Sequence, residues 1–201
     1  YQKLNQSLGT NIDSSALMRF EGGQVLDGYV PQAGGSVLGR SGVTVATGFD
    51  IGQINERQLL ALGLPKELED KLRPYTGLIK KDSVDYLQIN PLSITRSEAM
   101  QIDLAVKAQH LKSTIESWNA SDPYVSFGDL TQAQQTVIFS RTFHQGMGMP
   151  RTAVAQDFYK AALKGHWIDA ESALRSYNVS QKWYQNRVEA EANLLRTERT
   201  K

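Results

Sequence analysis

Apolar side chains recur at helical spacing through most of the chain beyond residue 54. The longest run lies between residues 95 and 118, and its apolar positions are Met100, Leu104, Ala108, Leu111, Ile115 and Trp118. Spacings of three and four residues place them on one stripe of a helix of about six turns. Thr95 and Glu98 stand three residues apart at its start, as in a capping box. The pattern therefore predicts one long helix over residues 95–118.

Other helices are predicted by the same spacing together with start and stop signals. Asp13 and the two serines after it can cap a short helix that Gly22-Gly23 ends. Thr131 and Gln134 form a second capping box. The remaining helical stretches are predicted over residues 55–62, 65–72, 150–164, 167–177 and 184–195.

The glycine-rich stretch at residues 21–53 has the pattern of strands and turns instead. It holds nine of the sixteen glycines, with Val, Tyr and Thr between them. Within it, SGVTVATGFD at residues 41–50 is predicted to form a strand, with Val43 and Val45 on one face. Alternation places Thr44 and Asp50 together on the other face, about six residues apart, where both could reach one water molecule.

These patterns predict an α+β architecture in a single domain spanning residues 1–201. A small β lobe at about 21–53 and a helical lobe at about 95–201 would be joined by the long helix. Ligand sites favour such lobe boundaries, so we expect an active-site cleft there.

Composition narrows the class of protein. The 22 basic and 21 acidic residues give a net charge of +1, which offers no electrostatic case for nucleic-acid binding. The absence of cysteine excludes disulfides and thiolate metal sites. No apolar stretch is long enough for membrane insertion. Because the chain begins at Tyr1 without methionine, we expect a processed product or a fragment of a larger protein.

Two carboxylates are candidates for acid–base chemistry. Glu21 lies in the last turn of the first predicted helix, whose C-terminal dipole disfavours a negative charge and so suits a general acid. Asp50 ends the predicted strand. Two carboxylates flanking a glycosidic bond are the minimum machinery for its hydrolysis. Each residue also has an ordinary interpretation: Glu21 as a solvated glutamate, Asp50 as a turn or cap residue, and Thr44 as a β-branched strand residue.

Other chemistries have weaker support. The three histidines, His110, His144 and His166, have no metal-ligand spacing such as H-E-x-x-H, so no metal site is predicted. Residues 39–43 fail the G-x-S-x-G pattern of serine hydrolases. We expect no cofactor.

Three segments resemble the phage T4-type lysozyme superfamily, and most closely the pesticin-like muramidase domain of bacterial toxins. They are MRFEGG at residues 18–23, SGVT with TGFDIGQ at 41–44 and 47–53, and FHQG at 143–146. Residues 183–195 also resemble the Arg- and Glu-rich closing helix of these enzymes. The likeness spans roughly residues 12–196.

The resemblance implies a role for each matching position. Glu21 would be the general acid, Asp50 the water-activating carboxylate and Thr44 the water-positioning hydroxyl. In the phage enzymes the second carboxylate precedes the threonine, and Asp27 stands near that place here. Asp27 is therefore the reserve candidate for the second carboxylate.

The resemblance also implies a function. The expected activity is cleavage of the β-1,4 bond between N-acetylmuramic acid and N-acetylglucosamine in peptidoglycan, with inversion if a water lies between the carboxylates. Tyr29, Phe143 and Gln145 are the expected glycan contacts. A toxin domain of this kind would be a delivered effector, acting as a monomer in the periplasm of a target bacterium, with a cognate immunity protein as a partner. Two rivals stay open: a glycan- or partner-binding module without activity, and a lytic transglycosylase that leaves anhydro ends.

Overall fold

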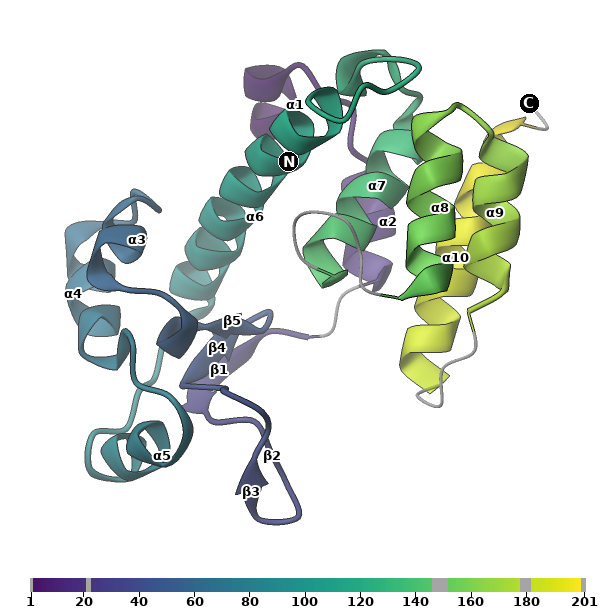
Figure 1. Ribbon diagram of the computed structural model, residues 1–201. Coiled ribbons are helices and arrows are strands. Elements are labelled where there is room, and N and C mark those ends of the chain that lie inside the picture. The colour runs from purple at the N-terminus through teal and green to yellow at the C-terminus, as the bar shows by residue number, and fades with distance from the viewer. Residues whose placement is uncertain (1, 21–22, 146–151, 178–181, 200–201) are drawn as a thin grey trace. The chain divides into compact units, whose positions relative to one another are not determined.

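The computed structural model describes residues 2–20, 23–145, 152–177 and 182–199 of the chain (Figure 1). The chain divides into two compact units, one made of residues 1–20 and 110–201 and the other of residues 21–109. The long helix α6 (Arg96–Asn119) runs across the division between residues 109 and 110. The first unit is thus formed by segments from both ends of the chain.

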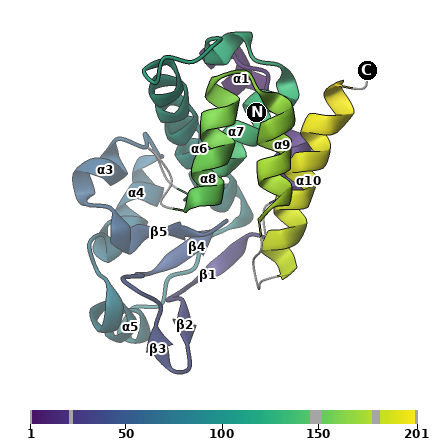
Figure 2. The same cartoon turned by 45° about the vertical axis from the view of Figure 1, so that its right-hand side comes forward.

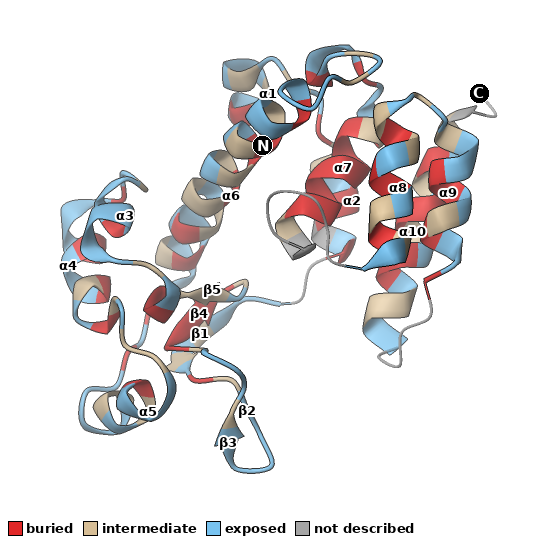
Figure 3. Ribbon diagram, viewed as in Figure 1, coloured by how far each residue is buried: buried red, intermediate tan, exposed pale blue. Residues whose placement is uncertain are grey.

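The first unit is helical in its described part. Besides the end of α6 it contains α1 (Gln2–Leu8), α2 (Ser14–Phe20), the short 3-10 helix η3 (Phe127–Asp129), α7 (Gln132–Gln145), α8 (Ala153–Leu163), α9 (Trp167–Arg175) and α10 (Lys182–Arg199). Helices α8, α9 and α10 lie side by side in both views (Figures 1 and 2). Every residue of α7 from 135 to 142 is buried, which makes this helix the centre of the unit (Figure 3).

The second unit combines a small sheet with short helices. Strands β1 (Val25–Tyr29), β4 (Thr44–Ala46) and β5 (Phe49–Asp50) form an antiparallel sheet in the order β1-β4-β5. A separate hairpin pairs β2 (Gln32–Ala33) with β3 (Ser36–Val37). The helical elements are η1 (Ile51–Gln53), α3 (Glu56–Leu60), α4 (Lys66–Leu72), η2 (Arg73–Tyr75), α5 (Lys80–Ile89) and the start of α6.

One apolar core joins the sheet of this unit to its helices. Its fully buried members include Val43 and Val45 from the sheet segment and Leu59, Leu72 and Ile102 from helices. Burial of these side chains, each stabilising by roughly 1.5–3 kcal/mol, holds the sheet against α3, α4 and α6.

The predicted helix starts are confirmed where side chains cap them. Asp13 accepts hydrogen bonds from the amides of Ser15 and Ala16 at 2.9 and 3.0 Å. The Thr95–Glu98 box is present, with the Thr95 amide donating to Glu98 at 2.6 Å and the Glu98 amide donating to the Thr95 hydroxyl at 3.2 Å. These motifs are local, so sequence alone identifies them.

The predicted apolar stripe of α6 is wrong in its first half. Met100 is 60% exposed and Leu104 is 48% exposed, whereas Ala99 and Ile102 are fully buried. The α6 sequence carries apolar residues on more than one face, and packing in the core of the second unit selects the face of Ala99 and Ile102. Leu111 and Trp118, farther along the helix, are buried as predicted.

The stretch from 41 to 50 is also not one continuous strand. It turns back between β4 and β5, where Ala46 and Gly48 have positive φ of 52° and 85°. Glycine adopts this backbone readily and lets the chain reverse within two residues. Thr44 and Asp50 therefore lie on neighbouring strands instead of six residues apart on one.

Two helices, α1 and α5, were not predicted individually. The start of α5 at Ile79 has no side-chain cap, and Ser83 is its only fully buried residue. A helix that buries so few apolar side chains shows no apolar stripe at helical spacing in its sequence, so the pattern does not predict it.

Candidate active site

Tyr29, Thr44 and Asp50 form a row across the three-stranded sheet. Tyr29 pairs with Thr44 between β1 and β4, and Thr44 pairs with Asp50 between β4 and β5. Directly opposite residues of antiparallel strands project from the same face, with their Cβ atoms about 4.5–5.5 Å apart. The pairing thus brings together three predicted site residues that are 15 and 6 positions apart in the chain.

Thr44 and Asp50 converge on the peptide groups of Gly42. The Thr44 hydroxyl donates to the Gly42 carbonyl oxygen at 3.2 Å. The Gly42 amide lies 3.1 Å from both carboxylate oxygens of Asp50. Because the Thr44 hydroxyl donates its proton to the Gly42 carbonyl oxygen, it can form a further hydrogen bond only as an acceptor.

Asp50 is half-buried, and backbone amides hold its carboxylate in place. Its Oδ1 accepts the amide of Gly52 at 3.1 Å, and this bond caps the 3-10 helix η1. The ordinary interpretation of Asp50 as a cap is therefore correct. Burial raises the pKa of this half-buried carboxyl, and hydrogen bonds from Gly42, Gly52 and Gln53 oppose the rise only in part. A carboxylate with a raised pKa is a stronger base.

Gly42 and Gly52 are required by a close approach of three backbone segments. A Cβ atom on Gly42 would lie 2.3 Å from the carbonyl oxygen of Leu78, and one on Gly52 would lie 2.1 Å from the same atom. Gly42 also forms an isolated β-bridge with Ile79. Any side chain at either glycine would push this segment away and with it the amides that hold Asp50.

The other residues predicted on β1 are exposed. Asp27 and Tyr29 both lie on the exposed positions of the strand, and Tyr29 is 40% exposed. Asp27 forms an isolated bridge with Ser93. An exposed tyrosine next to Thr44 has the amphipathic surface that sugar rings pack against.

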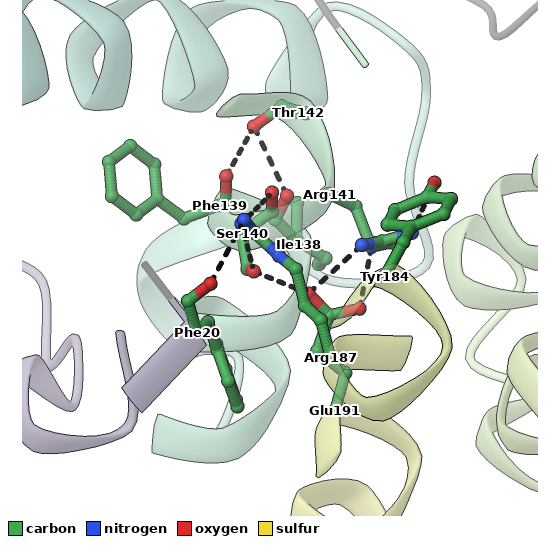
Figure 4. A network of polar contacts seen from close by, with 9 residues as sticks. All are labelled: Phe20, Ile138, Phe139, Ser140, Arg141, Thr142, Tyr184, Arg187 and Glu191. Carbon is green, nitrogen blue, oxygen red and sulfur yellow. Dashed lines mark hydrogen bonds and ion pairs between the residues drawn. The ribbon is translucent and has the colours of Figure 1, made fainter. Parts of the chain in front are cut away.

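Glu21 lies outside the described residues, and it directly follows Phe20, the last described residue of α2. The Phe20 carbonyl oxygen accepts a hydrogen bond from Arg187 Nη1 at 3.4 Å. Arg187 Nη2 also donates to the carbonyl oxygen and the hydroxyl of Ser140, at 3.2 and 2.9 Å. A carbonyl near the end of α2 is thereby tied to α7 and α10 (Figure 4).

This anchor is part of a buried charged network in the first unit (Figure 4). Glu191 is fully buried and lies between two arginines, 2.6 Å from Arg141 Nε and 3.3 Å from Arg187 Nε. Its Oε1 also accepts the Ser140 hydroxyl at 2.5 Å. Arg141 donates to the Tyr184 hydroxyl at 3.3 Å. Sequence similarity indicated an Arg- and Glu-rich helix here, but not that its charges are buried.

Phe143 belongs to the first unit and is half-buried there. Its ring packs edge-on against His110, with centroids 5.0 Å apart, and lies 6.0 Å from Phe139. Burial lowers the pKa of His110, so this neighbour is neutral at pH 7. The side chain of Gln145, at the end of α7, lies outside the described residues.

Sequence reasoning missed the supporting residues of the site. Gly42, Gly52 and Gln53 all fall within the SGVT and TGFDIGQ motifs, so the motif itself was the available signal. Asp103, which binds the β4–β5 turn from α6, is 56 positions from Thr47 and has no local signal.

Neither a metal cluster nor a membrane span is found in the part of the chain that the structure describes. Its residues contain no group of three or more His, Asp or Glu side chains placed to hold a metal ion. None of its helices combines the length and apolarity needed to cross a bilayer.

Comparison with known proteins identifies the family. The model of the Pesticin family, described as a bacterial toxin homologue of phage lysozyme, C-terminal part, matches residues 11–168. Among curated proteins, none matches this sequence significantly. The family match covers well over half of the chain and includes Glu21, Thr44 and Asp50. This chain therefore belongs to the Pesticin family of bacterial toxin homologues of phage lysozyme, and its α+β fold is lysozyme-like.

Proposed function

We propose that this protein is a muramidase, which hydrolyses the β-1,4 bond between N-acetylmuramic acid and N-acetylglucosamine in peptidoglycan. The observation that carries the proposal is the direct pairing of Thr44 with Asp50, both anchored on Gly42, inside the segment matched by a lysozyme-homologous family. A carboxylate and a hydroxyl acceptor on directly opposite residues project from the same face of the sheet, where both can bond one water molecule.

The proposed reaction uses that water as the nucleophile. The water donates one hydrogen bond to the Thr44 hydroxyl oxygen and one to the Asp50 carboxylate, which leaves a lone pair for the anomeric carbon. As the new C–O bond forms, Asp50 takes the proton from the water. Glu21 gives its proton to the glycosidic oxygen, so the leaving sugar departs as a neutral alcohol. Attack opposite the leaving group inverts the anomeric carbon.

The environment of Asp50 supports its assignment as the base. Burial raises its pKa, which strengthens the carboxylate as a proton acceptor. Asp27, exposed on β1, is the reserve carboxylate. Tyr29, Phe143 and Gln145 are the proposed glycan contacts, and no cofactor is needed.

The match to a family of bacterial toxin homologues supports a proposal for the setting of the reaction. We infer that the chain is a delivered antibacterial effector, part of a larger toxin, which acts as a monomer in the periplasm of a target bacterium. A cognate immunity protein would protect the producing cell by binding the domain.

The test is digestion of purified peptidoglycan with wild type, Glu21→Gln, Asp50→Asn and Asp27→Asn, with the released fragments read by mass spectrometry. We expect reducing-end muropeptides from wild type and Asp27→Asn, and none from the other two. If Asp27→Asn released no muropeptides while Asp50→Asn did, Asp27 and not Asp50 would be the second catalytic carboxylate. Anhydro ends would indicate a lytic transglycosylase. Binding without release by wild type would indicate a glycan-binding module.

A further inference from the structure

The carboxylate of Asp103 on α6 accepts hydrogen bonds from the turn that joins β4 and β5, two strands of the proposed site. Asp103 Oδ1 accepts the Thr47 amide at 3.0 Å, and its Oδ2 accepts the Thr47 hydroxyl at 2.7 Å. Oδ2 also accepts the side-chain amide of Gln24, just before β1, at 2.8 Å. One side chain thus holds both the β4–β5 turn and the entry to β1.

The turn has a backbone that needs external support. Ala46 is fully buried and has a φ of 52°, in the left-handed region that L residues rarely occupy. Gly48, on the other side of Thr47, has a φ of 85°. A non-glycine residue persists in this region only when its surroundings impose it. The two bonds from Thr47 to Asp103 provide such a constraint.

This turn joins the two strands that carry the site. Thr47 follows β4 directly and lies two residues from β5, so movement of Thr47 is passed to both strands. A displacement of about 1 Å at reacting groups can reduce catalysis about a hundredfold. Within the described residues, the Asp103 carboxylate bonds Thr47 and Gln24 and does not bond Thr44 or Asp50, so it acts on those two residues through the segments that it holds.

We propose that Asp103 is a positioning residue, whose carboxylate fixes the β4–β5 turn through Thr47 and thereby sets Thr44 and Asp50 opposite each other. The proposal rests on the proposed muramidase function. It adds a residue from α6, far along the chain from the SGVT and TGFDIGQ motifs, to the machinery of the site.

The test compares Asp103→Asn, Thr47→Val and the double variant in the full chain. Asn replaces one acceptor oxygen of Asp103 with an NH2 group, so one oxygen atom no longer accepts from the donors that now bond Asp103, the Thr47 amide and hydroxyl and the Gln24 side-chain amide. We expect each single variant to lower kcat on soluble glycan fragments by roughly tenfold to a hundredfold, with KM changed less than about threefold. The double variant should be no slower than the slower single variant, because both changes break the same contact.

Two controls separate positioning from general damage to the fold. Glu116→Gln makes the same chemical change at an exposed position of α6 and should leave kcat unchanged. Thr47→Ser keeps the hydroxyl and should restore most of the activity lost in Thr47→Val. An unchanged kcat in Asp103→Asn would overturn the proposal, as would losses that multiply in the double variant.

A readout without substrate distinguishes this proposal from the proposed function. Amide hydrogen exchange in Asp103→Asn should rise at residues 42–52 and stay unchanged in α3 and α4. If wild type releases no sugar ends but this local pattern is seen, the muramidase proposal fails while Asp103 still holds the turn. If exchange at residues 42–52 does not change, the positioning role fails whatever the activity.

Discussion

Gly42 shows at the scale of one residue why the site motif contains glycine. Gly42→Ala would place a Cβ atom 2.3 Å from the Leu78 carbonyl oxygen and 3.0 Å from Asp50 Oδ1. Backbone segments must then separate, and we expect the free energy of unfolding to fall by about 3 kcal/mol or more. Chemical denaturation measures this change.

The control for Gly42→Ala is Gly128→Ala. A Cβ atom on Gly128 would lie 3.8 Å from its nearest neighbour, the Gly9 carbonyl oxygen. The backbone of Gly128 does not have a positive φ, so alanine fits it without strain. This variant should stay within about 0.5 kcal/mol of wild type. Equal stability of the two variants would contradict the close approach at Gly42.

Asp50 gives a prediction on pH at the same scale. Burial raises its pKa in the folded protein above the ordinary value of 3.8, so the folded state binds the proton more tightly than the unfolded state. The contribution of Asp50 to stability is therefore present below pH 3.8 and is lost as pH rises through the folded pKa. Relative to Asp50→Asn, wild type should become more stable as pH falls from 7 toward 4. Denaturant melts of both proteins across this range measure the difference, and a constant difference would contradict the raised pKa.

At the scale of elements, the buried network ties α2, α7 and α10 together. Glu191→Gln would leave Arg141 and Arg187 buried without their counter-charge. Removing one partner of a buried ion pair costs roughly 3–5 kcal/mol. We expect a loss of stability of this order in thermal or chemical unfolding.

Glu189→Gln is the matched control on the same helix. Glu189 is exposed and accepts a hydrogen bond from the side-chain amide of Gln185, one turn earlier on the same helix, at 3.1 Å. Its change should alter stability by less than about 0.5 kcal/mol. If Glu191→Gln were equally mild, the network would be a replaceable feature of the core and not the anchor of α2.

At the scale of the whole molecule, the chain forms two compact units with residues 1–20 and 110–201 in one and 21–109 in the other. Cooperative units of this kind can open separately. In Glu191→Gln we expect amide exchange to rise more in α2, α7 and α10 than in β4, α3 and α4. Hydrogen exchange with residue resolution measures this, and an equal rise in both units would indicate one cooperative structure.

The sequence by itself determined the local features of this protein. The caps at Asp13 and Thr95 are formed by residues at most three positions apart, so short-range chemistry decides them. The α+β class also followed from the change of pattern near residue 54. The motifs around Thr44 and Asp50 indicate the candidate site and the family without any tertiary contact.

Only the tertiary structure decided which residues meet. It placed Thr44 opposite Asp50 across a turn, because Ala46 and Gly48 reverse the chain within what looked like one strand. It buried Ala99 and Ile102 instead of Met100 and Leu104, because packing chose among several apolar faces of α6. It brought Asp103 to Thr47 and Arg187 to Phe20, over 56 and 167 positions. Such contacts depend on the path of the whole chain, which no local pattern encodes.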